Sequence, residues 1–181
     1  MRDRLIDLKL CLDEIGGLQV STPEDRIGMQ KKIYLLQETG RVNLGYGFKW
    51  FIKGPYSSGL TEDMSDLWLR EEWVIEDAAK CELKDEVLEK INYIKPLLEI
   101  ENLDEQLKKH EWSVLLASIH FLKNKVCKSD EEELKETIRE QFPQYTNKQV
   151  CLAKEMLEKW GLFSDGAISS QEGGVGNEEK T

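Results

Sequence analysis

The chain has 181 residues, and its 35 acidic against 25 basic residues give a formal net charge of −10 at pH 7. This length suits one domain with a hydrophobic core of its own. The acidic balance argues against a general nucleic-acid binder, which carries an excess of lysine and arginine. No apolar run approaches the ~18 residues of a membrane-spanning helix, and the charged first residues do not resemble a secretory signal. We therefore expect no membrane contact and a cytoplasmic location.

Apolar residues at helical spacing, separated by capping signals, predict a mainly α-helical protein. The first helix is expected over 2–15. Thr22 supplies a hydroxyl N-cap for the second helix, Pro23 fits its first turn, and Gly40 ends it. Later helices are expected at 58–72, 84–94, 104–126, 130–141 and 146–159, with Pro96 beginning a further turn. The helix over 104–126 is nearly apolar all round at its centre, which is typical of a central buried helix.

A short aromatic run predicts the β-structure. Residues 48–52 (FKWFI) are β-prone, and strand alternation places Phe48, Trp50 and Ile52 on one face. We expect Gly54-Pro55 to end this strand, because proline lacks the N–H that a sheet ladder needs. The run Trp73-Val74-Ile75 is interpreted as a second short strand. In the intervening helix, the apolar spacing turns Leu60, Met64, Leu67 and Trp68 inward.

These elements together predict a mainly α fold with a small β hairpin or wing, built from 47–53 and 73–76. We expect one globular domain over 1–163, in which a winged-helix-like lobe (1–76) packs on a helical lobe (84–163). The segment 164–181 contains four glycines and almost no apolar residues to bury. It is therefore expected to be a disordered tail.

Patterns that carry catalysis or metal binding are not found. The chain lacks the glycine-rich phosphate-binding motifs and the nucleophile-elbow motif G-x-S-x-G. His110 and His120 are ten residues apart on one predicted helix, about 15 Å along its axis, too far to share a metal. The four cysteines fit no zinc spacing; we expect free thiols, with Cys11 and Cys151 on the apolar faces of helices. The sequence thus predicts no enzyme, no cofactor and no metal.

The segment 26–60 is the one basic stretch of this acidic chain. Between residues 26 and 53, six cations stand against Glu38 alone, a local net charge of +5. Aromatic residues interleave with the lysines, as in grooves that bind single-stranded nucleic acid. The alternative interpretation is that Trp50 belongs to the core and the lysines keep the surface soluble. The residues expected to contact a partner are Lys31, Lys32, Arg41, Lys49, Trp50, Lys53, Pro55 and Tyr56.

The same segment resembles a known family. A helix with KKIYLLQ, an aromatic segment, the turn GPYS and a helix ending DLWLREEWV are similar to the Panacea-domain and YwgA-like, SocA-type antitoxin-like proteins. The resemblance covers about residues 1–75. The matching positions are Lys32, Tyr34, Leu35, Gln37, Phe48, Trp50, Gly54, Pro55 and Leu60. The resemblance implies a mostly helical domain with a small β element and an antitoxin or adaptor role.

From these observations we expect a non-enzymatic regulatory module, antitoxin-like or phage-defence-associated, that docks a partner protein through the basic segment. The alternative is a winged-helix-like regulator that binds nucleic acid with the same face. The sequence gives neither the oligomeric state nor the identity of the partner.

Overall fold

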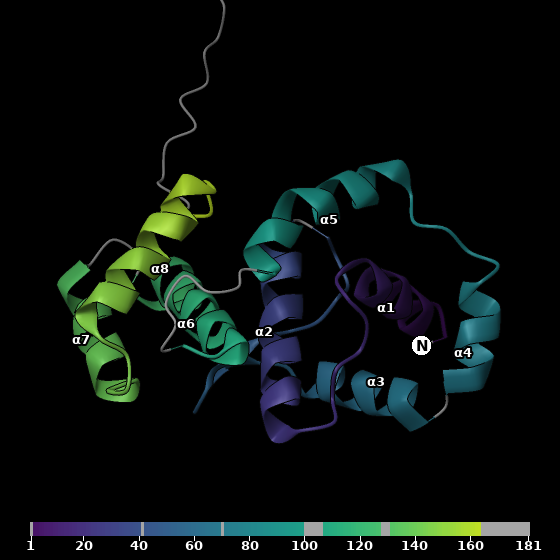
Figure 1. Cartoon of the computed structure of the whole chain (residues 1–181), viewed down its shortest axis with the longest axis horizontal. Coiled ribbons are helices and arrows are strands. Elements are labelled where there is room, and N and C mark those ends of the chain that lie inside the picture. Colours follow the sequence, from purple (N-terminus) through teal and green to yellow (C-terminus); the bar gives the residue numbers. More distant parts are fainter. Residues whose placement is uncertain (1, 41, 70, 100–106, 128–130, 164–181) are drawn as a thin grey trace, which may run out of the picture.

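The computed structural model describes residues 2–163 except 41, 70, 100–106 and 128–130, and this part of the chain is mainly helical with one two-stranded antiparallel sheet (Figure 1). The expected mainly α fold with a small hairpin is confirmed. The elements are α1 (Arg2–Glu14), α2 (Pro23–Glu38), β1 (Lys49–Phe51), β2 (Gly54–Tyr56), α3 (Ser58–Leu69), α4 (Glu71–Ala78), α5 (Asp85–Leu98), α6 (Lys109–Phe121), a π-helical turn (Leu122–Val126), α7 (Glu131–Gln141) and α8 (Asn147–Lys159).

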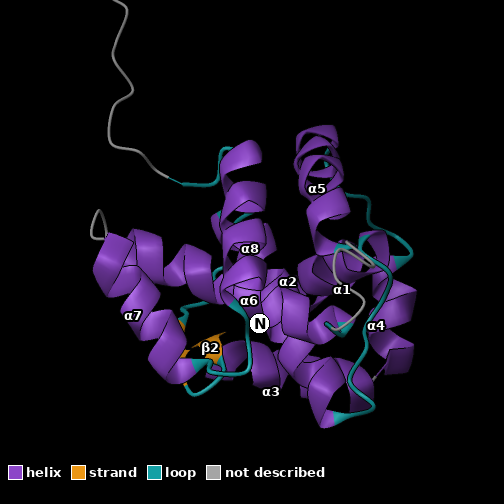
Figure 2. Ribbon diagram, turned by 60° about the vertical axis from the view of Figure 1, so that its left-hand side comes forward, coloured by secondary structure: helices purple, strands orange, loops and turns teal. Residues whose placement is uncertain are grey.

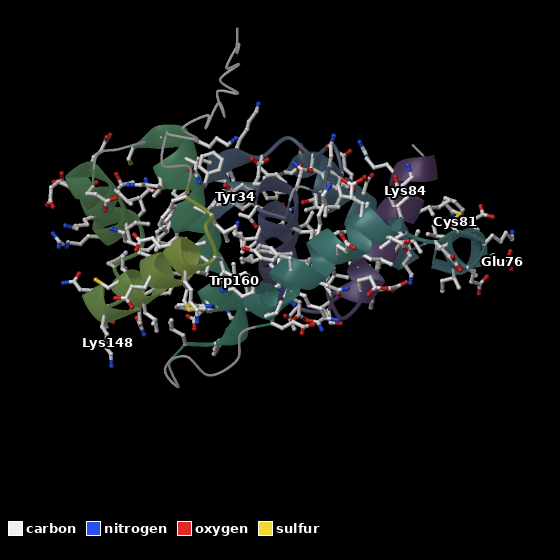
Figure 3. All side chains as sticks on the ribbon, turned by 90° about the horizontal axis from the view of Figure 1, so that it is seen from above. Tyr34, Glu76, Cys81, Lys84, Lys148 and Trp160 are labelled. Atoms are coloured by element: carbon white, nitrogen blue, oxygen red, sulfur yellow. The ribbon has the colours of Figure 1, made fainter. Side chains whose placement is uncertain are left out.

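Helix α2 lies at the centre of the molecule (Figure 1). It packs against α6, which in turn packs against α8, and both α2 and α6 contact β2. On the other side of α2, helices α1, α3 and α4 pack on one another, and α5 contacts α2. The sheet is a small element among the helices (Figure 2). Figure 3 shows Lys148 of α8 and Glu76 of α4 at opposite ends of the elongated molecule.

The helix starts follow the predicted capping chemistry. Thr22 Oγ1 accepts a hydrogen bond from the Asp25 N–H at 3.1 Å, and the Asp25 carboxylate accepts one from the Thr22 N–H at 2.9 Å. Pro23 occupies the first turn, as expected. Thr146 and Gln149 form the same reciprocal pair at the start of α8. These local bonds fix where α2 and α8 begin.

The buried hydrophobic side chains form one continuous cluster that includes residues from Leu5 to Leu162. Tyr34 of α2 lies fully buried within it, with its ring edge-on to Phe48 at 5.1 Å between centroids. The Tyr34 hydroxyl is 2.8 Å from Nδ1 of His120 on α6. Burial lowers the pKa of His120 to about 4, so the imidazole is neutral at pH 7 and fits an uncharged core.

The hairpin differs from the expected one in both its strands and its turn. Strand β1 pairs with β2, immediately after it, and Gly54 and Pro55 lie inside β2 instead of ending a strand. Ile52 and Lys53 form the two-residue turn, so Ile52 leaves the buried face on which alternation placed it. Pro55 is tolerated because it sits opposite Trp50, next to the Phe51–Gly54 pair. The Phe51–Gly54 pair that closes the two-residue turn is a hydrogen-bonded pair, and the two kinds of pair alternate in an antiparallel ladder. The Trp50–Pro55 pair is therefore non-hydrogen-bonded and needs no N–H from proline.

The second strand expected at 73–76 is wrong, because these residues belong to helix α4. Val74 and Ala78 are buried and are four residues apart, which is a helical period, while Ile75 is 45% exposed. Three β-prone residues are too few to override the surrounding helix formers. Helix α4 instead packs against α1.

Other helix boundaries also differ from the expected ones. Helix α5 continues past Pro96 to Leu98, because Leu97 and Leu98 are buried and their packing offsets the one backbone hydrogen bond that proline removes. The residues 104–106 of the expected central helix and the expected tail 164–181 lie outside the described residues.

Asp63 of α3 is a buried carboxylate. It accepts hydrogen bonds from Nε of Arg4 at 2.6 Å and from the Tyr46 hydroxyl at 2.7 Å. The carboxylate therefore joins α3 to α1 and to the loop that precedes β1. Burial together with this hydrogen bond raises the pKa of Tyr46, so the hydroxyl remains a donor.

We predict that Asp63→Ala lowers the free energy of unfolding by about 3 kcal/mol, because it leaves the buried Tyr46 hydroxyl and the Arg4 guanidinium without their acceptor. Urea unfolding followed by circular dichroism measures the change. Asp66→Ala, one turn later on the same helix, is the matched control and should stay within about 0.5 kcal/mol of wild type. Equal effects for the two variants would contradict this role of Asp63.

Trp50 and Phe51 are adjacent on β1 but have opposite environments. The Trp50 ring packs against Phe121 and Phe142, with centroids at 5.6 and 6.0 Å, and its Nε1 donates to Gln141 Oε1 at 2.8 Å. Phe51 faces the other way and is 58% exposed.

We predict that Trp50→Ala lowers the free energy of unfolding by about 3 kcal/mol. This value is at the lower end for a packed aromatic residue, because Trp50 is only half-buried. Phe51→Ala should cost less than about 1 kcal/mol in the same urea experiment.

Candidate functional site

A groove with a volume of about 710 Å³ lies between α2, the hairpin turn and α3, and we call it the α2–α3 groove. Half of its lining residues are apolar or aromatic. Its residues are Val20, Ser21, Arg26, Ile27, Gln30, Lys31, Phe51, Ile52, Lys53, Gly54, Tyr56, Thr61, Met64, Ser65, Trp68 and Leu69. The size falls within the range of ligand-binding pockets, roughly 300–1,000 Å³.

Large apolar side chains that are exposed gather at this groove. Phe51 is 58% exposed, Ile52 74%, Trp68 56% and Leu69 78%, and all four line the groove. Only three other large hydrophobic residues are exposed in the part of the chain that the structure describes. Scattered exposed apolar residues are ordinary, whereas a contiguous group marks a surface that another molecule covers.

Gln30 fixes the walls of the groove to one another. Its Nε2 donates to the Ser57 carbonyl at 2.9 Å and to Thr61 Oγ1 at 2.8 Å, and its Oε1 accepts from the Ser57 N–H at 3.0 Å. The Thr61 hydroxyl also donates to the Tyr56 hydroxyl at 3.0 Å. One buried amide thus ties α2 to the end of the hairpin and to α3. The groove is therefore formed before any partner binds.

Gly54 brings the hairpin close to α6. Its φ of +83° is in the left-handed region that favours glycine, and an added Cβ would lie 2.3 Å from Ser118 Oγ. A side chain at this position would displace the hairpin turn from the groove. Gly54 is one of the positions that carry the family resemblance, and this close approach to α6 explains why a glycine fits there.

Lys31 is the unusual residue of the groove. It lines the groove but is only 2% exposed, and its Nζ donates to the Pro55 carbonyl at 2.6 Å. Loss of hydration lowers the pKa of this ammonium to about 7, with no contribution from a neighbouring charge. A lysine pKa near neutrality is uncommon, and perturbed groups concentrate at functional sites.

The charge of the lining is one-sided. Arg26 and Lys53 are exposed, Lys31 lies deeper, and none of the described lining residues is acidic. This is notable in a chain with a net charge of −10. The groove therefore combines an apolar surface with positive potential, which favours an apolar partner of negative charge.

The structure separates the residues that the sequence had grouped as one basic face. Lys31 and Lys32 are buried, whereas Lys49 and Lys53 are exposed on the hairpin. Helix α2 packs against α6, β2 and α5, and the two lysines at its centre are buried by the fold. Arg41 lies outside the described residues.

The aromatic residues among the predicted partner-binding residues also lie in different environments. Trp50 is half-buried and packs against the core, which favours the alternative interpretation that it belongs to the core. Tyr56 is half-buried and lines the groove, next to Phe51 at 5.5 Å between ring centroids. Pro55 is buried, and its carbonyl accepts from Lys31. Of the predicted partner-binding residues, Lys31, Lys53 and Tyr56 line the groove.

Sequence reasoning missed the wall that α3 provides. Trp68 was expected to point inward, but it is exposed in the groove together with Leu69, while Leu67 is buried. The signal was the run Leu67-Trp68-Leu69. Successive helical residues are about 100° apart, so three in a row cannot share one buried face.

Other candidate sites are less developed. Within the described ranges, no three His, Cys, Asp or Glu side chains gather closely enough to hold a metal ion. Cys11 is buried as expected, and burial raises its pKa to about 12. Cys151 was expected on an apolar face but is exposed, beside a smaller cavity of about 280 Å³ between α7 and α8. The described helices are all too short or too polar to cross a membrane.

Comparison of the chain with protein-family models, with curated proteins and with solved structures gives no significant match. The family resemblance noted in the sequence therefore stays a prediction, and the functional argument rests on the geometry of the groove.

We predict that Lys31→Met stabilises the protein at pH 6 and that this gain shrinks as the pH rises. The folded pKa of Lys31 is about 7, against 10.5 ordinarily, so between these values only the unfolded state holds the proton. Wild-type stability should therefore rise by up to about 1.4 kcal/mol per pH unit in this window from this one group. The burial penalty is fully present below pH 7 and is gone above about pH 10.5. The variant lacks the ammonium and should not show this rise.

The measurement is urea unfolding at pH 6, 7, 8 and 9 for both proteins. Lys53→Met, at an exposed lysine of the same groove, is the control and should leave the pH profile of wild type unchanged. A Lys31→Met effect that is the same at every pH would show that Lys31 is not a desolvated cation.

Proposed function

We propose that the chain is a non-enzymatic regulatory interaction module that docks a partner protein in the α2–α3 groove. The single observation that carries this proposal is the gathering of Phe51, Ile52, Trp68 and Leu69 on one preformed groove. Aromatic residues supply most of the binding energy at protein interfaces, and they do so best in pockets that exclude water.

The partner that fits this groove presents an apolar segment. The volume of the groove accommodates a few large side chains, and the hydrogen bonds of Gln30 hold its walls in place, so little ordering is needed upon binding. The exposed Arg26 and Lys53 at its lining favour negative charge in the approaching partner.

The antitoxin-like or phage-defence-associated character is proposed from the sequence resemblance. Several of the residues that carry the family resemblance make structural contacts in this region. Gln37 bonds both the N–H and the carbonyl of Tyr46, at 2.9 and 2.8 Å, and Leu60 is fully buried on α3. Such residues would maintain the α2–hairpin–α3 unit on which the groove depends. Neutralisation of a toxin encoded by an adjacent gene, tested by co-expression, examines this part of the proposal.

The nucleic-acid alternative is favoured by one observation, the exposure of Lys49 and Lys53 together on the hairpin. It has less support than protein docking, because Lys31 and Lys32 are buried and cannot meet phosphates at the surface. A fluorescence titration with single-stranded and duplex DNA at low salt distinguishes the two. Binding that weakens steeply with salt and is lost in a Lys49→Glu, Lys53→Glu double variant would favour the alternative.

We predict that Trp68→Ala and Leu69→Ala abolish partner recovery from a lysate of the native host while leaving stability within about 1 kcal/mol of wild type, since both side chains are exposed. Quantitative pull-down with mass spectrometry measures the recovery. Ile75→Ala, at an exposed apolar residue of α4 outside the groove, is the matched control and should retain the partner. A stoichiometric partner retained equally by all three variants would contradict docking in the groove.

A further inference from the structure

The ammonium of Lys31 is incompletely satisfied within the protein. A lysine ammonium has three N–H donors, and the acceptor found for it among the described residues is the Pro55 carbonyl at 2.6 Å. Among the described residues, no carboxylate contributes to its electrostatics, and the residue is only 2% exposed. Buried charges in proteins are ordinarily paired with an opposite charge. Here the counter-charge is missing.

Lys31 differs in this respect from the other partly covered lysines of the protein. Lys123 and Lys154 share the carboxylate of Glu131, and Lys9 pairs with Asp13 at 2.6 Å. Of these four lysines, Lys31 is the one without a carboxylate partner among the described residues, and it lines the large apolar groove. The location of the unpaired cation therefore coincides with the surface that a partner is proposed to cover.

We infer that the segment of the partner protein that fills the α2–α3 groove carries an aspartate or glutamate whose carboxylate pairs with Lys31, between large apolar side chains that cover Trp68 and Phe51. This inference rests on the proposed function and names the chemistry that selects the partner. Lys31 is thus a specificity-determining residue, whereas the exposed apolar residues supply most of the contact area.

Physical chemistry favours this arrangement over an entirely apolar segment. Covering the groove with an apolar segment alone would close the last access of water to the ammonium and leave its remaining N–H donors without an acceptor, which is costly. A carboxylate supplies a charge-assisted hydrogen bond where water has been excluded, and such bonds are about twice as strong as neutral ones. The site therefore discriminates by penalising partners that lack the acid.

The test begins with a selection that needs no knowledge of the natural partner. A phage-displayed library of random dodecapeptides is selected on the full-length protein at pH 6.5, where Lys31 is protonated. The strongest binders are synthesised with a fluorescent label. Dissociation constants are then measured by fluorescence anisotropy for the wild type and for Lys31→Met, Trp68→Ala and Lys49→Met.

The decisive measurement is a double-mutant cycle between the protein and each peptide. Replacing the peptide's Glu by Gln, or Asp by Asn, should weaken binding to wild type at least tenfold, equivalent to about 1.4 kcal/mol. The same replacement should change binding to Lys31→Met less than twofold, since the partner charge is already gone. Lys49→Met, at an exposed lysine that does not line the groove, is the matched control and should behave as wild type.

The outcomes separate the inference from the proposed function. Peptides whose binding is lost in Trp68→Ala but is indifferent to the acid-to-amide replacement would overturn the carboxylate pairing and leave groove docking intact. Equal acid-to-amide effects on wild type and Lys31→Met would likewise overturn the assignment to Lys31. Peptides that bind Trp68→Ala as well as wild type, or a selection that enriches none, would overturn both proposals.

Discussion

Burial of α2 on every side constrains the rest of this structure. All nine residues from Gly28 to Leu36 are buried, including three with polar side chains. A buried polar group needs partners within the protein, and those partners must come from whatever packs against the helix. For Gln30 they come from Ser57 and Thr61, and for Lys31 from Pro55. The position of the hairpin and of α3 is thus tied to the polar demands of α2.

This constraint also shapes the groove. The backbone from Pro55 to Ser57 serves as acceptor and donor for α2, so the hairpin approaches the helix by its second strand. The turn at Ile52 and Lys53 then projects beyond the core, opposite Trp68 and Leu69 of α3. Apolar residues on both sides of the groove remain uncovered, while the hydrogen bonds of Gln30 hold its walls in place. The groove and its buried cation have the same structural origin.

Much of the helical framework could be predicted from the sequence, because its signals are local. Thr22 and Pro23 specify the start of α2 through bonds to residues three positions away, and Thr146 does the same for α8. Periodicity placed Leu5, Leu8 and Leu12 in the core, and each is buried. Neither signal depends on what packs against the helix.

The candidate site could not be predicted equally well, because it depends on tertiary packing. The charge of Lys31 and Lys32 suggests a solvated face, and the packing of α6 against α2 overrides it. The strand propensity of residues 73–75 predicted the wrong element. Val74 and Ala78 are buried at a helical spacing, and the helix that contains them packs against α1. Part of the basic segment lines the groove, but its lysines do not form one surface. Its interior supplies a buried cation, and its hairpin supplies one wall of an apolar groove.

Two features of the groove oppose stability, and their coincidence supports the proposal that a partner covers this surface. A buried ammonium without a counter-charge destabilises the folded state, and exposed tryptophan and leucine promote association. Methionine at residue 31 would remove the charge, but it would also remove the hydrogen bond to the Pro55 carbonyl. Natural sequences depart from local consistency mainly at functional sites. When an uncompensated cation and uncovered apolar residues share one groove, a single partner that is both apolar and acidic resolves both.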